Sequence, residues 1–300
     1  MKIYTLDLNF QHVPQTIAAY LVVGDGGPVL VETGPGSTLA ALKSALGQHG
    51  FQPADVRHVL VTHIHLDHAG AAGWWAQQGA QVYVHHFGAP HLINPDRLLQ
   101  SASRIYGDKM DALWGDFLPS PAERVTTVAD GDVIEVVGLR FTAIETPGHA
   151  RHHHVFRLGG VAFTGDAAGI HLPDMPMIDV PAPPPEFDLE AWENSIDRLL
   201  AENLQTLYPT HFGAVNDPIQ HLTTLKGQIR ETAVYIKTQL DAGVARDKLV
   251  ETYNQWNRNR AKSAGMSDAA IHQYEISNPW YMSVDGISRY WRKREKGAAS

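Results

Sequence analysis

Short runs of apolar residues alternate with helix-like stretches along the first half of the chain. The stretches 18–23 and 28–31 read as strands around the turn GDGG, and Ser37 can cap a helix over 37–49 that ends before Gly50. We expect one more strand at the amino terminus and others at 57–61 and 81–85, with a short helix at 70–78. Strands that alternate with helices in this way predict an α/β fold.

A helix-like insertion and a second group of strands follow. Residues 86–121 break the alternation and contain Tyr106, Trp114 and Phe117. This insertion either fills space by packing or caps a pocket, and the pattern leaves both interpretations open. Strand patterns then resume at 133–137, 139–144, 155–158 and 161–163. The proline run 181–186 must be extended, as the rim of a site or as a stiff connector.

The last part of the chain has a helical pattern. Asp217 and Pro218 are a capping residue and a proline at the first helical position, which together indicate a helix start. Such a helix would carry one apolar stripe, formed by Leu222, Leu225, Ile229, Ala233, Ile236 and Leu240. Because this stripe and the tryptophans behind it are too apolar to face water, we expect 217–294 to pack on the preceding residues or across a homodimer interface.

Composition and charge narrow the class of protein. The chain has 300 residues, 44% of them hydrophobic, a formal net charge of −8 and no cysteine. An acidic chain lacks the broad positive field that attracts nucleic acid. The amino terminus has no signal-peptide pattern, and no apolar run reaches the length of a membrane span, so we expect a cytoplasmic protein. Without cysteine, any metal must be held by nitrogen and oxygen.

Histidines and aspartates gather where the predicted strands end. The stretch VLVTHIHLDHAG places His63, His65, Asp67 and His68 directly behind an apolar strand. Two metal ions a few ångströms apart would use two neighbouring groups of ligands of this kind.

Three further ligand-type residues repeat the same arrangement. His149 follows the turn in ETPGHARHHHVF, where we expect it to be exposed, Asp166 follows the strand in FTGDAAG, and His211 lies in TLYPTHFG. A single histidine in such a place is most often structural, but this repetition makes a metal site the better interpretation.

With THIHLDHAG, TPGHARHH, FTGD and PTHFG in this order, the sequence resembles the metallo-β-lactamase fold superfamily, in particular its glyoxalase II-like hydrolases. The resemblance covers roughly residues 1–215 and implies an αββα sandwich with the metals at one edge of its two sheets. We therefore predict an α/β fold of this type with the helical insertion at about 86–121, a core domain over 1–215, and a helical C-terminal extension over 216–300 that packs on the core.

The resemblance also implies the roles of the ligands. His63, His65 and His149 would hold a first metal ion, and Asp67, His68 and His211 a second, with Asp166 bridging both. Asp67 and Asp166 would also be catalytic. Zinc is the first expectation for the two divalent ions, and iron or manganese suit the same donors. True β-lactamases of this superfamily generally have cysteine or serine at the place of Asp166, so the aspartate argues against antibiotic hydrolysis as the native role.

Water shared by two such cations ionises near neutral pH, which predicts a metal-dependent hydrolase of small esters, lactones or thioesters. The alternatives are a phosphodiesterase or nuclease, a persulfide dioxygenase with a single iron, and a metal-binding protein without turnover. The resemblance further gives His153 a supporting role beside the ligands, and Glu32 a bracing role that the family usually gives to aspartate. His152, His154, His171 and Tyr208 are weaker candidates for contact with the substrate.

Overall fold

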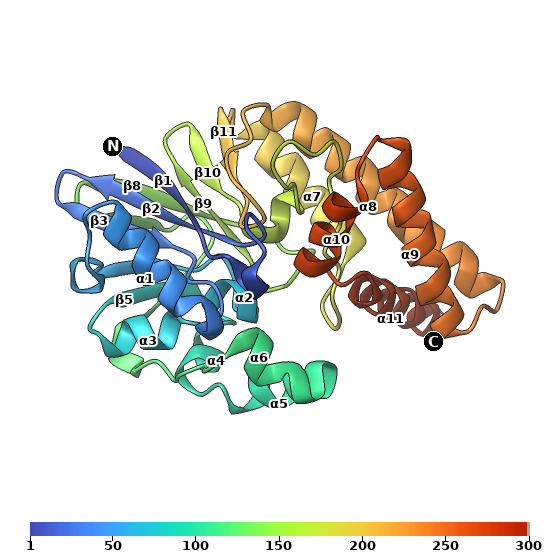
Figure 1. The fold of residues 1–300 in the computed structure, drawn as a ribbon, viewed down its shortest axis with the longest axis horizontal. Helices are drawn as coiled ribbons and strands as arrows, with labels where there is room; N and C mark the ends of the chain where they lie inside the picture. Colours follow the sequence, from blue (N-terminus) through green and yellow to red (C-terminus); the bar gives the residue numbers. More distant parts are fainter. Residues whose placement is uncertain (299–300) are drawn as a thin grey trace. The chain divides into compact units, whose positions relative to one another are not determined.

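The computed structural model describes residues 1–298 and has a mixed α/β fold with two sheets (Figure 1). The strands are β1 Lys2–Asp7, β2 Ala18–Gly24, β3 Gly27–Val31, β4 His58–Leu60, β5 Gln81–His85, β6 Val125–Val128, β7 Val133–Val136, β8 Leu139–Glu145, β9 His154–Leu158, β10 Val161–Phe163 and β11 Thr206–Tyr208. The helices are α1 Leu39–Gln48, α2 Leu66–Ala69, α3 Ala72–Gln77, α4 Ala89–Ile93, α5 Asp96–Tyr106, α6 Met110–Trp114, α7 Leu189–Ala201, α8 Pro218–Asp241, α9 Arg246–Ser263, α10 Asp268–Ser277 and α11 Trp280–Ala298.

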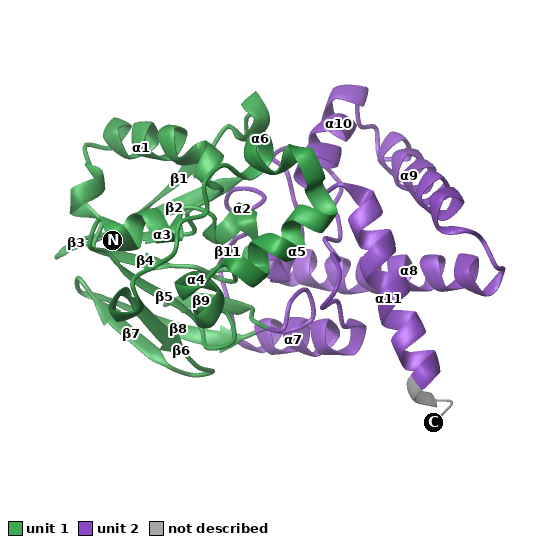
Figure 2. Cartoon of the chain, turned by 90° about the horizontal axis from the view of Figure 1, so that it is seen from below, with its two compact units in different colours: residues 1–145, 152–165 green, residues 146–151, 166–300 purple. Residues whose placement is uncertain are grey.

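The chain divides into two compact units, which Figure 2 shows in different colours. Unit 1 consists of Met1–Glu145 and His152–Gly165, and unit 2 of Thr146–Arg151 and the described residues from Asp166 onward. The units therefore interleave along the sequence. The division into a core over 1–215 and an extension over 216–300 follows the motifs instead and stays a prediction.

The first sheet lies in unit 1, with its strands in the order β1-β2-β3-β4-β5-β6. Strands β1, β2 and β3 are antiparallel, whereas β3, β4, β5 and β6 are parallel. Because parallel strands end at the same edge, the register Val31↔Leu60 places the residues that follow β3 and β4 side by side. The chain leaving β3 starts with Glu32, and the chain leaving β4 carries the HIHLDH motif.

The second sheet of unit 1 contains the antiparallel strands β10, β9, β8 and β7 in that order. Aromatic side chains join the two sheets, since the rings of Tyr20 on β2 and Phe163 on β10 are 5.5 Å apart and both are fully buried. Phe141 on β8 continues this core, with its ring 6.2 Å from that of Phe163. The hydrophobic residues of both sheets therefore form one core, as expected for a sandwich.

The predicted insertion contains α4, α5 and α6, and part of it packs firmly on unit 1. Trp114 is buried, with its ring 5.6 Å from that of Phe10 and 5.0 Å from that of Tyr106. The hydroxyl of Ser37 donates to the carbonyl oxygen of Leu113 at 2.6 Å. The insertion thus contributes packing through Trp114, while its role as a cap stays a prediction.

Unit 2 carries the C-terminal helices, and α8 begins where the sequence indicates. The carboxylate of Asp217 accepts from the backbone amide of Gln220 at 3.0 Å, and Pro218 is the first helical residue. The predicted stripe is buried from Leu222 to Ile236, whereas Leu240 is partly exposed. Helix α8 packs against α7, α9 and α11, all within unit 2.

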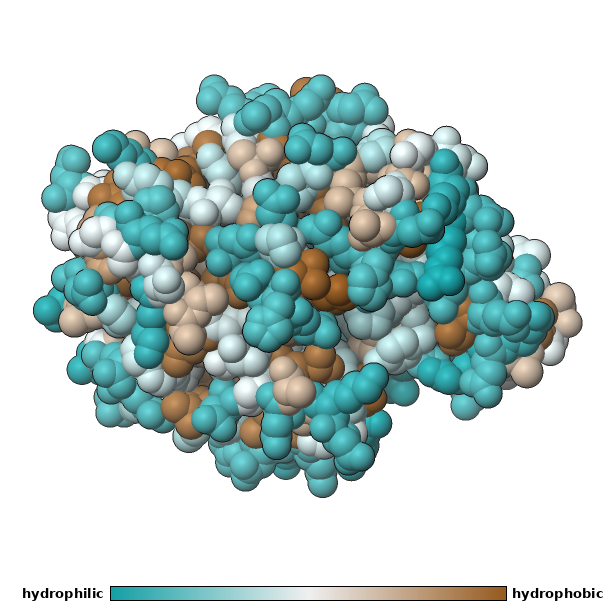
Figure 3. Space-filling model, in the orientation of Figure 1, coloured by the Kyte–Doolittle hydropathy of each residue, from teal (hydrophilic) through white to brown (hydrophobic). Residues whose placement is uncertain are grey.

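The face seen in Figure 3 is mostly hydrophilic, with small separate groups of hydrophobic atoms. On α8, Ile219 and Val234 are exposed although the same helix buries its apolar stripe. Among the described helices, none is both long and apolar enough to cross a membrane.

Candidate metal centre

The first group of predicted ligands lies in unit 1, in the turn after β4 and the first turn of α2. His63 and His68 are fully buried, whereas His65 and Asp67 are partly exposed. The rings of His63 and His68 lie 3.9 Å apart, and those of His63 and His65 lie 4.5 Å apart. Unit 1 thus brings these predicted ligands together, with the Asp67 carboxylate 3.8 Å from Nε2 of His68.

Two ring nitrogens in this group converge on each other. Nε2 of His63 lies 2.9 Å from Nδ1 of His65, while Nδ1 of His63 lies 3.1 Å from the hydroxyl of Thr62. When His63 carries its hydrogen on Nδ1 and donates it to Thr62, the Nε2 lone pair points toward His65. Lone pairs that converge in a buried place suit a shared cation, and the nitrogen and oxygen donors match zinc, iron or manganese.

Glu32 braces this group from the adjacent strand end, as expected. Its Oε1 accepts the backbone amide hydrogen of Thr62 at 3.0 Å, and its Oε2 lies 3.5 Å from Nδ1 of His68. Glu32 is buried and has a φ of 66°, in the left-handed region that non-glycine residues rarely adopt. One carboxylate therefore bonds to the backbone before the motif and lies beside the last histidine of the motif.

His153 and His152 approach the same group from the chain that precedes β9. The ring of His153 lies 4.8 Å from that of His63, and its support of the ligands by hydrogen bonding stays a prediction. The ring of His152 lies 6.1 Å from that of His63 and 5.5 Å from that of His65. Sequence reasoning gave His152 little weight, yet the structure places it beside two predicted ligands.

The second group of predicted ligands lies in unit 2 and consists of His149, Asp166 and His211. Nε2 of His149 lies 3.3 Å from Oδ2 of Asp166, and Nε2 of His211 lies 3.7 Å from Oδ1 of Asp166. The carboxylate therefore faces both imidazoles. The expectation that His149 is exposed is wrong: it is only 1% exposed, because the turn that carries it packs against α7.

Trp192 on α7 explains this burial. A Cβ atom on Gly148, whose φ is +134°, would lie 2.2 Å from Cβ of Trp192, so the turn needs glycine both for its conformation and for this close approach. The Trp192 indole donates to the carbonyl oxygen of Ala167 at 2.9 Å. One tryptophan thus contacts the segments that carry His149 and Asp166, a role that sequence reasoning missed.

Hydrogen bonds from the surrounding backbone orient these ligands. Nδ1 of His149 donates to the carbonyl oxygen of Pro181 at 2.8 Å, which leaves the lone pair of Nε2 for a metal. The backbone amide of His171 donates to the carbonyl oxygen of His211 at 2.6 Å. His171 therefore supports a predicted ligand through its backbone, and burial lowers the pKa of its ring.

His221 in the first turn of α8 supports the Asp166 segment from another side. Its Nε2 donates to the carbonyl oxygen of Ala168 at 2.7 Å. Burial lowers the pKa of His221 to about 4, so the ring is neutral and keeps a single hydrogen. The position of this histidine on the apolar side of α8, directly before Leu222, was the available signal for its role.

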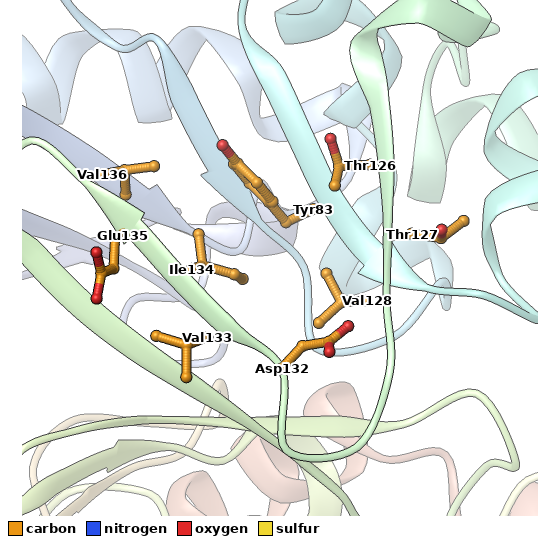
Figure 4. Close-up of a pocket in the computed structure, with 9 residues that line it drawn as sticks. All are labelled: Tyr83, Thr126, Thr127, Val128, Asp132, Val133, Ile134, Glu135 and Val136. Carbon is orange, nitrogen blue, oxygen red and sulfur yellow. The ribbon is translucent and has the colours of Figure 1, made fainter.

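A surface pocket in unit 1 involves none of the predicted ligands. It has a volume of about 280 Å³ and is lined by residues of β5, β6 and β7 with the turn before β7 (Figure 4). Its lining residues are Tyr83, Thr126, Thr127, Val128, Asp132, Val133, Ile134, Glu135 and Val136. The predicted metal ligands therefore lie in the two His/Asp groups and outside this pocket.

A family model supports the sequence motifs. The model described as the metallo-beta-lactamase superfamily matches residues 13–211, which span both ligand groups. The "Lactamase-like protein aptB" of Emericella nidulans is 30% identical over 269 residues, which cover 88% of this chain and 68% of that protein. A hydroxyacylglutathione hydrolase of Xanthomonas campestris is 31% identical over 146 residues, but these cover only 44% of that enzyme.

Solved structures support the fold. The metallo-beta-lactamase family protein TTHA1429 from Thermus thermophilus aligns over 98% of this chain and 94% of its own, with a TM-score of 0.70 and 23% identity. The archaeal superfamily protein ST1585 from Sulfolobus tokodaii aligns over 75% of this chain and 85% of its own, with a TM-score of 0.63 and 24% identity. At these identities the likeness shows a shared fold, including the helical C-terminal extension in the first case.

Proposed function

Because the chain belongs to the metallo-beta-lactamase superfamily, we propose that it is a metal-dependent hydrolase with two divalent ions, most simply zinc. The observation that carries this proposal is the presence of two preformed groups of His and Asp ligands. Each group has a carboxylate and imidazole nitrogens directed at one another, and each is braced by neighbouring backbone or side chains. Seven ligands shared by two ions would leave coordination positions open, whereas a structural metal site is usually closed by four ligands.

We assign the ligands by their order in the family motifs. His63, His65 and His149 would hold one ion, Asp67, His68 and His211 would hold the other, and Asp166 would serve both. Bound in this way, the ions would supply Lewis-acid polarisation of a carbonyl oxygen and a water that ionises near neutral pH. Asp166 suits the shared position because its two carboxylate oxygens face different histidines.

The residues of the chain contribute orientation and control of hydrogens. His149 keeps its hydrogen on Nδ1 because the carbonyl oxygen of Pro181 accepts it, so Nε2 stays available as a ligand. Glu32 accepts from the amide of Thr62 and thereby fixes the start of the HIHLDH turn. Asp67 is partly exposed, whereas Asp166 is buried.

We propose a small, uncharged acyl compound as the substrate: an aryl ester, a lactone or a thioester. The net charge of −8 does not favour a polyanionic substrate. The relative named hydroxyacylglutathione hydrolase agrees with an acyl substrate, although the chain matches less than half of that enzyme. The absence of cysteine agrees with a reducing compartment, and we propose the cytoplasm as the location.

A substrate panel tests the proposal. The full chain is stripped of metal with a chelator, reloaded with zinc, and assayed for kcat/KM on an aryl ester, a lactone, a thioester, a bis(aryl) phosphodiester and a β-lactam. We expect an acyl substrate other than the β-lactam to be fastest, with turnover lost on chelation and restored by zinc. Asp166→Ala should lose most of this activity, whereas Asp247→Ala, at an exposed carboxylate on α9, should keep it. A faster phosphodiester would overturn the acyl assignment, and zinc-independent turnover would overturn the mechanism.

A further inference from the structure

Unit 1 contains another group of ligand-type side chains, formed by His85, Glu145 and His154. One ligand atom from each residue lies within 4.8 Å of the other two. None of the three belongs to the seven residues assigned above. We call these three residues the strand-end trio. Their arrangement therefore needs its own explanation.

The topology of the two sheets brings the trio together. His85 is the last residue of β5 in the first sheet, Glu145 is the last residue of β8, and His154 is the first residue of β9 in the second sheet. Glu145 and His154 are direct partners in the antiparallel register. The three residues are therefore far apart in sequence but stand at one end of the sandwich.

Backbone hydrogen bonds fix the trio independently of its side chains. The amide of His154 donates to the carbonyl oxygen of Thr62 at 2.8 Å, and the amide of Glu145 donates to Oδ1 of Asp130 at 2.8 Å. These bonds use only main-chain atoms of His154 and Glu145, so the backbone positions of both residues do not depend on what their side chains bind.

His154 is the observation that calls for a ligand. It is fully buried, and neither of its ring nitrogens has a hydrogen-bond partner among residues 1–298. Burial, together with the nearby His85, lowers its pKa to about 3, so the ring is neutral and presents a lone pair. A buried polar group without a partner is unfavourable, and a bound cation would satisfy this lone pair.

We propose that the strand-end trio binds one divalent transition-metal ion of the zinc type, distinct from the two ions proposed above. Two imidazoles and one carboxylate are a known zinc ligand set that leaves a further position open. The side chain of Glu145 is 33% exposed whereas that of His85 is fully buried, so an ion can enter from the Glu145 side. Such an ion would connect β5 of one sheet to β8 and β9 of the other.

One hydrogen must move for the ion to bind. Nδ1 of His85 accepts the amide hydrogen of Phe87 at 3.0 Å, so its own hydrogen is on Nε2 and is donated to Oε1 of Glu145 at 2.8 Å. To bind a metal through Nε2, His85 must carry its hydrogen on Nδ1 instead, and the Phe87 amide must turn away. Phe87 is 47% exposed, so water can accept its amide hydrogen. The tautomer changes without net loss of a proton, and the Phe87 amide becomes a reporter of binding.

Ion counting tests the proposal. The full chain is loaded with zinc, passed through a desalting column and analysed for metal content. We expect His154→Leu and Glu145→Gln each to hold one ion fewer than the wild type, and His272→Leu, at an exposed histidine on α10, to match the wild type. Equal ion counts in the wild type and both trio variants overturn the proposal, whatever the occupancy of the centre formed by the seven ligands assigned above.

A second readout follows an amide next to the trio in the wild type, and its spectrum also shows whether the variant used for comparison is folded. The chain has nine phenylalanines, so a spectrum of the ¹⁵N-Phe-labelled protein is simple to assign. Zinc added to the metal-free chain should shift the Phe87 amide signal in the wild type and not in Glu145→Gln. An unchanged Phe87 signal in the wild type, or the same shift in both proteins, contradicts the site.

Discussion

His149 donates its Nδ1 hydrogen to the carbonyl oxygen of Pro181, 2.8 Å away, and helix α11 bonds to the residues on either side of this proline. The hydroxyl of Ser283 on α11 donates to the carbonyl oxygen of Val180 at 2.9 Å and accepts from the amide of Ala182 at 3.2 Å. The two residues that flank Pro181 are thus fixed by one serine. The proline run therefore acts in unit 2 as a support for a predicted ligand.

Replacing this serine tests the support. In Ser283→Ala, we expect the site assigned to His63, His65 and His149 to bind zinc about tenfold more weakly. The hydrogen-bond partners of metal-bound histidines typically change metal affinity by about tenfold to a hundredfold. Competition with a chromophoric chelator measures the change. Ser277→Ala, which removes a hydroxyl bonded only within α10, is the control. Equal losses in the two variants would mean that Pro181 does not depend on Ser283.

The number of ions at the proposed centre can be tested at His211. In His211→Ala, we expect the ion held by Asp67, His68 and His211 to bind more weakly, while the ion held by His63, His65 and His149 stays. Elemental analysis across a zinc titration should therefore show one ion of reduced affinity. Loss of both ions together, or no change, would argue against separate ligand sets joined by Asp166.

The free energy of unfolding should depend on pH through His221. Its pKa is about 4 in the folded chain and about 6.5 when unfolded, so below pH 6.5 the unfolded chain binds a proton that the folded chain does not. This lowers the stability as the pH falls from 6.5 to 4, by about 2 kcal/mol at pH 5.

His221→Gln should remove that loss, because glutamine can still donate to Ala168 but does not titrate. Urea unfolding at pH 7.5 and pH 5 measures the difference. We expect the wild type to lose about 2 kcal/mol more than the variant between these two values. An equal loss in both proteins would show that His221 is not responsible.

Removing the C-terminal helices should disrupt the remaining part of unit 2. The buried carboxylate of Asp179 accepts a hydrogen bond from the side-chain amide of Asn278 at 2.9 Å and another from the indole of Trp280 at 2.8 Å. Burial raises the pKa of Asp179 while these bonds oppose the shift. A chain that ends at Ala214 loses both donors and exposes apolar surface, so we expect it to aggregate. Its solubility, size by gel filtration and activity measure the outcome, and a soluble, monomeric, fully active fragment would contradict this prediction.

The sequence predicted the elements whose pattern is local. Strand β5 has the predicted bounds, and α8 starts at Pro218 behind Asp217, because apolar runs and capping residues act over a few positions. Strand β6 was missed because VTTV is short and carries no clear alternation. Helix α7 was also missed, although its buried Leu189, Trp192, Ile196 and Leu199 follow a helical spacing behind the capping Asp188.

The candidate site was predicted in part because its motifs are also local in the sequence. The motifs named every residue that the two His/Asp groups contain, and Glu32 has the contacts expected of it. The burial of His149 was not predictable, because it depends on Trp192, more than forty residues away along the chain. The strand-end trio was equally hidden, since only the register of β8 and β9 makes Glu145 and His154 neighbours.

The interleaving of the two units has a consequence for how this chain can evolve and fold. The backbone passes from one unit to the other at residues 145–146, 151–152 and 165–166, so any contiguous fragment that contains one whole unit also contains a segment of the other. A contiguous exchange of either unit by recombination would therefore also replace a segment of the other unit. Unit 1 can complete its contacts only after residue 165 has been synthesised, and unit 2 only after its C-terminal helices, so we expect slow folding governed by pairings that are distant in sequence.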